Sequence, residues 1–241
     1  MLDPGTRRPC QLAKSLGALG DERWSDMLVA AVRQDANADL RVCAAHALGA
    51  LAAHESVDDL IEAYQHNAAP TYVLSALGHI ADPSSMSFLQ SVAASPRSEP
   101  EQWAVKIAID RVRTMQQPNP VPALIDRVQQ SLAMGSLDAW AIRKLAEASD
   151  DRAVQCFHQL LERGQRLNEA GCILLVAGLL AGGPAGRASL EELSEARIAW
   201  PAVARVLEAA MSLLEESSRE PLRQTTWAHR LNTVRISWRS E

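Results

Sequence analysis

The chain has 241 residues, of which 47% are hydrophobic, 22% charged and only 4% aromatic. This composition allows a sizeable core of Ala, Leu and Val, and the lack of β-branched and aromatic runs argues against strands. A formal charge of −5 provides no overall attraction for phosphate backbones, so nucleic acid is not an expected partner. We find no secretory signal and no segment near the roughly 20 apolar residues of a membrane span. Four scattered cysteines indicate neither a disulfide framework nor a zinc ribbon, so we expect a cytoplasmic protein.

A repeat of about 30 residues appears when the Leu-Gly pairs are aligned. Leu16-Gly17, Leu48-Gly49 and Leu77-Gly78 are followed by Ile107-Ala108, with steps of 32, 29 and 30 residues. Eight positions before this glycine column stand Pro9, Arg41, Pro70 and Pro100. Proline is favoured in the first turn of a helix, so the pattern predicts that a helix starts there in each unit.

The columns −5, −4 and −1 before the glycine form one apolar stripe with helical spacing. They hold Leu12, Ala13, Leu16; Ala44, Ala45, Leu48; Val73, Leu74, Leu77; and Trp103, Ala104, Ile107. After the glycine a short turn leads into another helix, over residues 22–34, 56–67 and 83–94. Asp21, Asp82 and Asp150 are placed to act as N-caps. Each unit is therefore a helix pair that must stack on its neighbours to bury its apolar faces, which predicts an all-α fold, an α-solenoid.

The stretch "DANADLRVCAAHALGAL" resembles the HEAT-like repeats of phycobilisome (PBS) lyases, and the similarity extends over residues 9–113. The resemblance implies an inter-repeat ladder in which Asp35 pairs with Arg41. It also implies that the second helix of each pair lines a concave groove. Its solvent side, at columns −6, −3, −2 and +1, would then be the binding surface. The candidate binding residues are Gln11, Lys14, Cys43, His46, Tyr72, Ser75, His79, Gln102 and Lys106; Ser15 shares this side.

The proline-rich stretch "MQQPNPVP", residues 115–122, breaks the array, and the period then becomes degenerate. Ala146 and Gly178 continue the glycine column, and a last unit follows Trp200-Pro201. We therefore expect clear repeats in 1–117, degenerate helix pairs in 118–217 and an amphipathic C-terminal helix in 218–241. That last helix has an apolar stripe of Trp227, Leu231, Val234 and Trp238 and is interpreted as a cap on the last repeat.

No group of residues in the sequence has the composition and spacing of a catalytic or metal-binding site. Cys43 and His46 lie one helical turn apart, but a metal site needs three or four ligands and His79 is the one neighbour in reach. A nucleophilic cysteine would need an oxyanion hole, which a smooth helix face does not offer. We therefore expect no catalytic residue, metal or cofactor, and a scaffold or adaptor that binds another protein. The alternatives are a phycobilin lyase-like subunit that holds a bilin-type small molecule and, behind it, a binder of the HEAT-like DNA glycosylase type.

Overall fold

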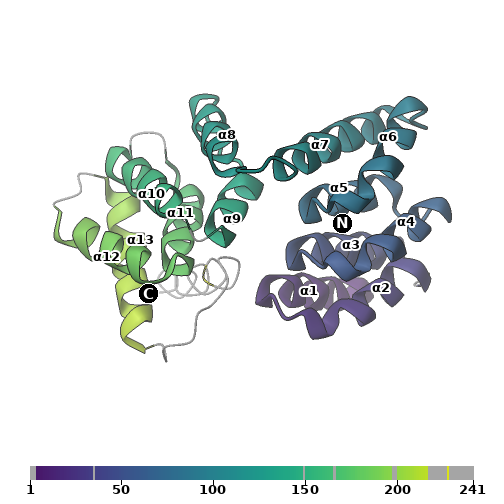
Figure 1. Ribbon diagram of the computed structural model, residues 1–241. Helices are drawn as coiled ribbons and strands as arrows, with labels where there is room; N and C mark the ends of the chain where they lie inside the picture. The colour runs from purple at the N-terminus through teal and green to yellow at the C-terminus, as the bar shows by residue number, and fades with distance from the viewer. Residues whose placement is uncertain are drawn as a thin grey trace. The chain divides into compact units, whose positions relative to one another are not determined.

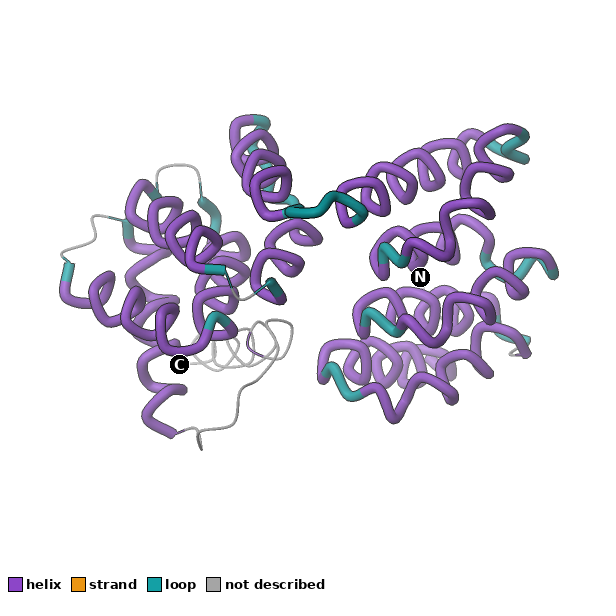
Figure 2. Tube along the Cα trace, viewed as in Figure 1, coloured by secondary structure: helices purple, strands orange, loops and turns teal. Residues whose placement is uncertain are grey.

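The computed structural model describes residues 4–34, 36–148, 150–164, 167–196 and 200–216, together with Trp227. Within these residues all regular structure is helical (Figures 1 and 2), so the predicted all-α architecture of stacked helix pairs is confirmed. The contacts divide the chain into two compact units, Met1–Pro118 and Asn119–Glu241. None of the described helices is long and apolar enough to cross a bilayer.

Unit 1 is a stack of helices in two layers. The second helices of the pairs, which form one layer, are α1 (Pro4–Leu19), α3 (Ala38–Leu51), α5 (Pro70–Ile80) and α7 (Glu99–Met115), and they pack on one another in chain order. The first helices are α2 (Ser25–Gln34), α4 (Val57–Gln65) and α6 (Met86–Ala94), and each follows a single 3-10 turn. Figure 1 shows α1, α3 and α5 one above another, with α2 and α4 to one side of this row. α2 packs on α3, and α4 packs on α5.

Aspartates begin the first helices as the sequence predicts. Asp21 and Asp82 accept hydrogen bonds from backbone N–H groups two residues on. Gly20 before Asp21 and Ala81 before Asp82 are in the left-handed conformation, with φ of 72° and 59°, and α3 ends in the same way on Ala52, with φ of 54°. His54 Nδ1 also donates to Asp82 Oδ2 at 2.6 Å, so this cap ties two successive repeats together.

Close contacts between small residues hold the second helices together. A Cβ on Gly17 would lie 2.8 Å from Ala47 Cα, one on Gly49 would lie 3.1 Å from Ala76 Cα, and one on Gly78 would lie 2.8 Å from Ala108 Cα. Each glycine therefore contacts the backbone of the next second helix. The contact point is the residue two positions before the glycine position of that next helix. This explains why the sequence keeps glycine in these columns.

The same contact corrects the register of α7. Ala108 occupies the place of Ala47 and Ala76, so the residue equivalent to the glycines is Asp110 and not Ala108. The buried stripe of α7 therefore contains Val105, Ala108, Ile109 and Val112, whereas Trp103 and Ile107 are 58% and 45% exposed. The sequence expectation that Trp103 and Ile107 belong to the core was wrong, because Ile107-Ala108 imitates a Leu-Gly pair.

Two further expectations near the N-terminus were wrong. Leu12 was expected in the core but is 56% exposed, because no described helix covers column −5 of α1. Pro9 does not begin a helix, since α1 already begins at Pro4. Pro70 and Pro100 do lie in the first turns of α5 and α7.

A buried carboxylate anchors the start of α7 to α4. Ser98 caps α7 by accepting from Glu101 N. Glu101, only 3% exposed, accepts hydrogen bonds from Tyr64 Oη at 3.1 Å and Arg97 N at 3.0 Å. The Arg97 guanidinium stacks over the Tyr64 ring at 4.4 Å. This network links α4 to the last pair of unit 1, in addition to the contact of Gly78 on α5 with Ala108 on α7.

The described residues of unit 2 form three further helix pairs. They are α8 (Val121–Ala133) with α9 (Ala139–Glu147), α10 (Asp151–Arg163) with α11 (Glu169–Ala181), and α12 (Gly183–Glu195) with α13 (Pro201–Glu216). The second helices α9, α11 and α13 again pack in order, and α8, α10 and α12 form the other layer. Asp150 caps α10 as predicted. The segment between Met115 and Val121 connects the last helix of unit 1 to the first of unit 2.

Two sequence expectations fall outside the described residues. Asp35, the proposed partner of Arg41, is one of them, and nearly all of the C-terminal segment is another. Within that segment Trp227 alone is described, and it is buried at 2% exposure. The boundaries 1–117, 118–217 and 218–241 stay predictions.

Candidate functional site

The candidate site lies on the exposed side of the second helices in unit 1. We call this surface the second-helix face and define it by eight exposed or half-buried side chains, which come from columns −6, −3 and +1 of α1, α3 and α5 and from Trp103 and Ile107 of α7. They are Gln11, Lys14, His46, Tyr72, Ser75, His79, Trp103 and Ile107. Six of these residues were candidates from the sequence, whereas Trp103 and Ile107 were missed because of the shifted register of α7.

Two histidines from successive repeats meet at the centre of this face. The ring centroids of His46 on α3 and His79 on α5 are 6.1 Å apart, with an angle of 45° between the planes. His79 reaches this place because its Cβ packs where Gly49 has no side chain, 3.1 Å from an ideal Cβ there. The glycine column thus both joins the helices and brings the two imidazoles together.

Aromatic and apolar groups lie toward the α5 and α7 end of the face. Tyr72 is 49% exposed, close to the values for Trp103 and Ile107. Lys106 Nζ lies 5.6 Å from the Trp103 ring centroid, so an exposed cation borders the indole. The sequence predicted that Gln102 and Lys106 belong to the binding surface. The register correction moves each of them by two columns, so they lie at the border of the second-helix face.

Cys43 does not lie on the second-helix face, although the sequence predicted that it would. It is 7% exposed and lies beside Cys10 of α1, whose Sγ donates to Asp39 O at 3.3 Å. Burial, and after it the hydrogen bond with Cys43, raises the pKa of the Cys10 thiol to about 11. Cys156 and Cys172 are buried too, and burial raises the pKa of each to about 11. The thiols of Cys10, Cys156 and Cys172 are therefore protonated at neutral pH and unsuited to nucleophilic attack.

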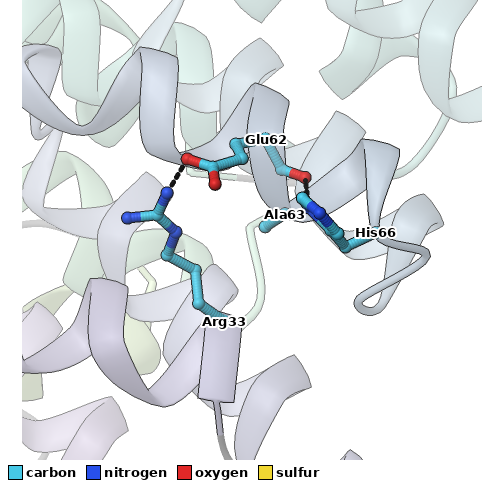
Figure 3. Close-up of a pocket in the computed structure, with 4 residues that line it drawn as sticks. All are labelled: Arg33, Glu62, Ala63 and His66. Atoms are coloured by element: carbon cyan, nitrogen blue, oxygen red, sulfur yellow. Dashed lines mark hydrogen bonds and ion pairs between the residues drawn. The ribbon is translucent and has the colours of Figure 1, made fainter.

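A hollow lies in the other layer of unit 1. This hollow, of about 410 Å³ between α2 and α4, is lined by Arg33, Glu62, Ala63 and His66 (Figure 3). The Arg33 guanidinium points across it to the Glu62 carboxylate and also pairs with Asp59 at 2.9 Å. His66 Nδ1 donates to Glu62 O at 2.9 Å. Because its polar groups already satisfy one another, the hollow offers a ligand little to bind.

The described residues do not form a catalytic or metal centre. They contain no group of three or more His, Cys, Asp or Glu side chains that could hold a metal ion. His158 Nδ1 lies 2.8 Å from Ser189 Oγ, a pair that sequence reasoning missed. Ser189 is in the interior of α12 and 8% exposed, where the backbone N–H groups are engaged in the helix and cannot form an oxyanion hole. We interpret this pair as a link between α10 and α12.

The two layers of unit 1 carry opposite charge. In the described helices, α1, α3, α5 and α7 carry seven Lys or Arg residues against four carboxylates. The first helices with their 3-10 turns carry two arginines against six carboxylates. α1 and α5 have no carboxylate at all, and α3 has Asp39 alone. The layer of second helices, which carries the second-helix face, is therefore net basic, although the chain as a whole is acidic.

Comparisons with known proteins leave the chain without a family. No protein-family model matches it, and no curated protein matches it. Among solved structures, human deoxyhypusine hydroxylase is similar over 88% of this chain and 99% of that protein, with 17% identity and a TM-score of 0.35. A likeness at this level carries no functional argument.

Proposed function

We propose that the chain is a protein-binding scaffold, an adaptor, assembly factor, chaperone or immunity-type inhibitor, that engages another protein through the second-helix face. The observation that carries this proposal is the exposure of Tyr72, Trp103 and Ile107 on one side of a rigid stack. Large aromatic side chains supply much of the binding energy in protein interfaces. The other large exposed apolar residues of the described chain are Leu12, Trp24, Met27 and Met134, and they do not belong to this face.

The packing of unit 1 supports this use. The contacts of Gly17, Gly49 and Gly78 fix the spacing of the second helices, so the face is preorganised. Binding by a preorganised surface loses less conformational entropy than binding by a flexible one. We also propose that unit 1 is built from HEAT-like repeats of the PBS-lyase type, as the sequence resemblance implies.

The phycobilin lyase-like alternative has one observation in its favour. His46, His79 and Tyr72 offer hydrogen-bonding groups near one another, suited to the propionates of a bilin. The buried position of Cys43 removes the thiol that was its candidate for transient attachment. Mixing the protein with biliverdin tests this alternative. The scaffold proposal predicts no change in the visible absorbance band, whereas the bilin alternative predicts a shift that is lost in His46→Ala.

Affinity capture with paired variants tests the scaffold proposal. The full chain, a face variant (Tyr72→Ser with Trp103→Ser) and a control variant (Met27→Ser with Met134→Ser) are immobilised and exposed to an extract of the source cells. We expect one protein in near-stoichiometric amount on the wild type and the control, and at least tenfold less on the face variant. Equal recovery on all three, or no stoichiometric protein on any, would contradict the proposal.

A further inference from the structure

We infer that the second-helix face takes an acidic segment of a partner protein that carries apolar anchor residues. This inference rests on the proposed function and names the chemistry of the partner. It follows from two properties of the same face, its charge and its exposed apolar groups.

The charge of the partner follows from the segregation of charges between the layers. Lys14 on α1 and Lys106 on α7 lie at opposite ends of the face, and both are exposed. His46 and His79 lie between them and can donate hydrogen bonds to carboxylates. Charge complementarity steers association and excludes partners of like sign. A basic segment would meet the cations at both ends, and the exposed carboxylates that the second helices offer it are Asp39 on α3 and Glu99 and Asp110 on α7, since α1 and α5 have none.

The anchors follow from the exposed apolar groups at the α7 end. Trp103 and Ile107 lie one helical turn apart on α7 and expose 58% and 45% of their surface. Contact with a Leu or Phe side chain of the partner would bury the largest apolar surface of this pair and so contribute most to the binding free energy. A nucleic acid is the weaker candidate, because it would offer many phosphates to few cations on a chain whose net charge is −5.

The test uses the full chain and fluorescein-labelled peptides of about twelve residues. The first peptide places two leucines and a phenylalanine among glutamates, the second replaces every glutamate by lysine, and the third replaces the anchors of the first by alanine. Fluorescence anisotropy should show that the first peptide binds at least tenfold more tightly than either of the others. Raising NaCl from 50 to 500 mM should weaken this binding, since screening acts on exposed charges.

Matched variants locate the binding. Lys14→Glu with Lys106→Glu should weaken the first peptide at least tenfold, whereas Arg163→Glu with Arg205→Glu, the same charge change at exposed sites in unit 2, should leave its Kd within twofold. Trp103→Ala should weaken it by about 30-fold, the size of an interface hot spot. Trp24→Ala, at another exposed tryptophan, should change it less than twofold.

Several outcomes would overturn the inference. If the lysine peptide binds as tightly and Trp103→Ala abolishes this binding, the face binds protein but the acidic partner is wrong. If no peptide binds, or charge reversal acts no more than its control, the inference fails, while the capture experiment tests the proposed function separately. A single-stranded oligonucleotide that displaces the acidic peptide, or self-association that Lys14→Glu with Lys106→Glu abolishes, would assign the face to nucleic acid or to a second copy.

Discussion

Both units stack helix pairs, but they fill the space between helices differently. In unit 1 Gly49 and Gly78 receive alanine backbones of the next second helix. In unit 2 a Cβ on Gly178 would instead lie 2.6 Å from the Phe157 ring, which belongs to α10 of the same pair. Unit 1 thus uses its glycines to join repeats, whereas unit 2 uses Gly178 to seat a large side chain within one pair.

This difference explains the hollow and the position of the candidate site. Where the second helices approach closely on small residues, the first helices are left farther apart, and Arg33 bridges α2 and α4 at the hollow. The periodic columns that hold unit 1 together also fix the order of the helices that carry His46, Tyr72 and Trp103.

Replacing a glycine by alanine should give the largest difference in stability between the packing of unit 1 and that of unit 2. Gly78→Ala puts a Cβ against the Ala108 backbone, so the helices must move apart, and we expect a loss of about 3 kcal/mol in the free energy of unfolding. Gly178→Ala meets a ring that can turn, and we expect a loss about half as large. Gly135→Ala, with open space around it and φ of +84°, controls for backbone strain of about 1 kcal/mol. Urea denaturation measures all three, and an equal loss at Gly78 and Gly135 would remove the packing argument.

Removal of the Glu101 carboxylate should have the next largest effect. Glu101→Ala leaves the Tyr64 hydroxyl and Arg97 N–H without their buried acceptor, which costs about 2 kcal/mol. Tyr64→Phe removes one donor and should cost about 1 kcal/mol. Thermal unfolding followed by circular dichroism gives both values. If Glu101→Ala were neutral, α7 would not depend on this link to α4.

The aspartate caps provide a smaller comparison between the units. Asp150→Ala removes a local cap of α10 and should cost about 1 kcal/mol. Asp82→Ala removes both a cap and the contact with His54 of the preceding repeat, so its loss should be larger by a few tenths of a kcal/mol. His54→Ala should reproduce that difference. Equal losses at Asp82 and Asp150 would show that the link between repeats contributes nothing.

The smallest expected effects are on the dependence of stability on pH. The hydrogen bond from the Arg152 side chain lowers the pKa of Asp150 to about 2, so this stabilisation is complete above the ordinary pKa and is lost as pH falls toward 2. Burial, and after it the Glu101 hydrogen bond, raises the pKa of Tyr64, so its contribution is complete below pH 10 and is lost at higher pH. In a plot of the free energy of unfolding against pH, Tyr64→Phe should reduce the loss of stability at alkaline pH, and Asp150→Asn should reduce the loss at acid pH. An unchanged pH dependence in urea titrations would contradict these assignments.

The period of the sequence was enough to predict the helix pairs, their N-caps and most of the second-helix face. It failed at α7, because the glycine column of this helix holds Asp110 and the pair Ile107-Ala108 resembles a Leu-Gly pair two residues earlier. The prediction also failed at Cys43. A cysteine side chain is small enough to occupy either a buried position beside Cys10 or an exposed position, and the period does not distinguish the two. The pairing of His46 with His79 depends on the offset between α3 and α5, which spacing within one helix does not reveal.

Photocrosslinking tests the central claim, that the second-helix face of unit 1 contacts the partner protein. p-Benzoylphenylalanine is placed at position 72 or 103 on the face and, as controls, at position 27 on α2 or 134 after α8, and the cell extract is irradiated with each protein. We predict a crosslink to one and the same protein from positions 72 and 103 and none from 27 or 134. Crosslinks from 27 or 134, with none from 72 and 103, would contradict the assignment of the binding surface.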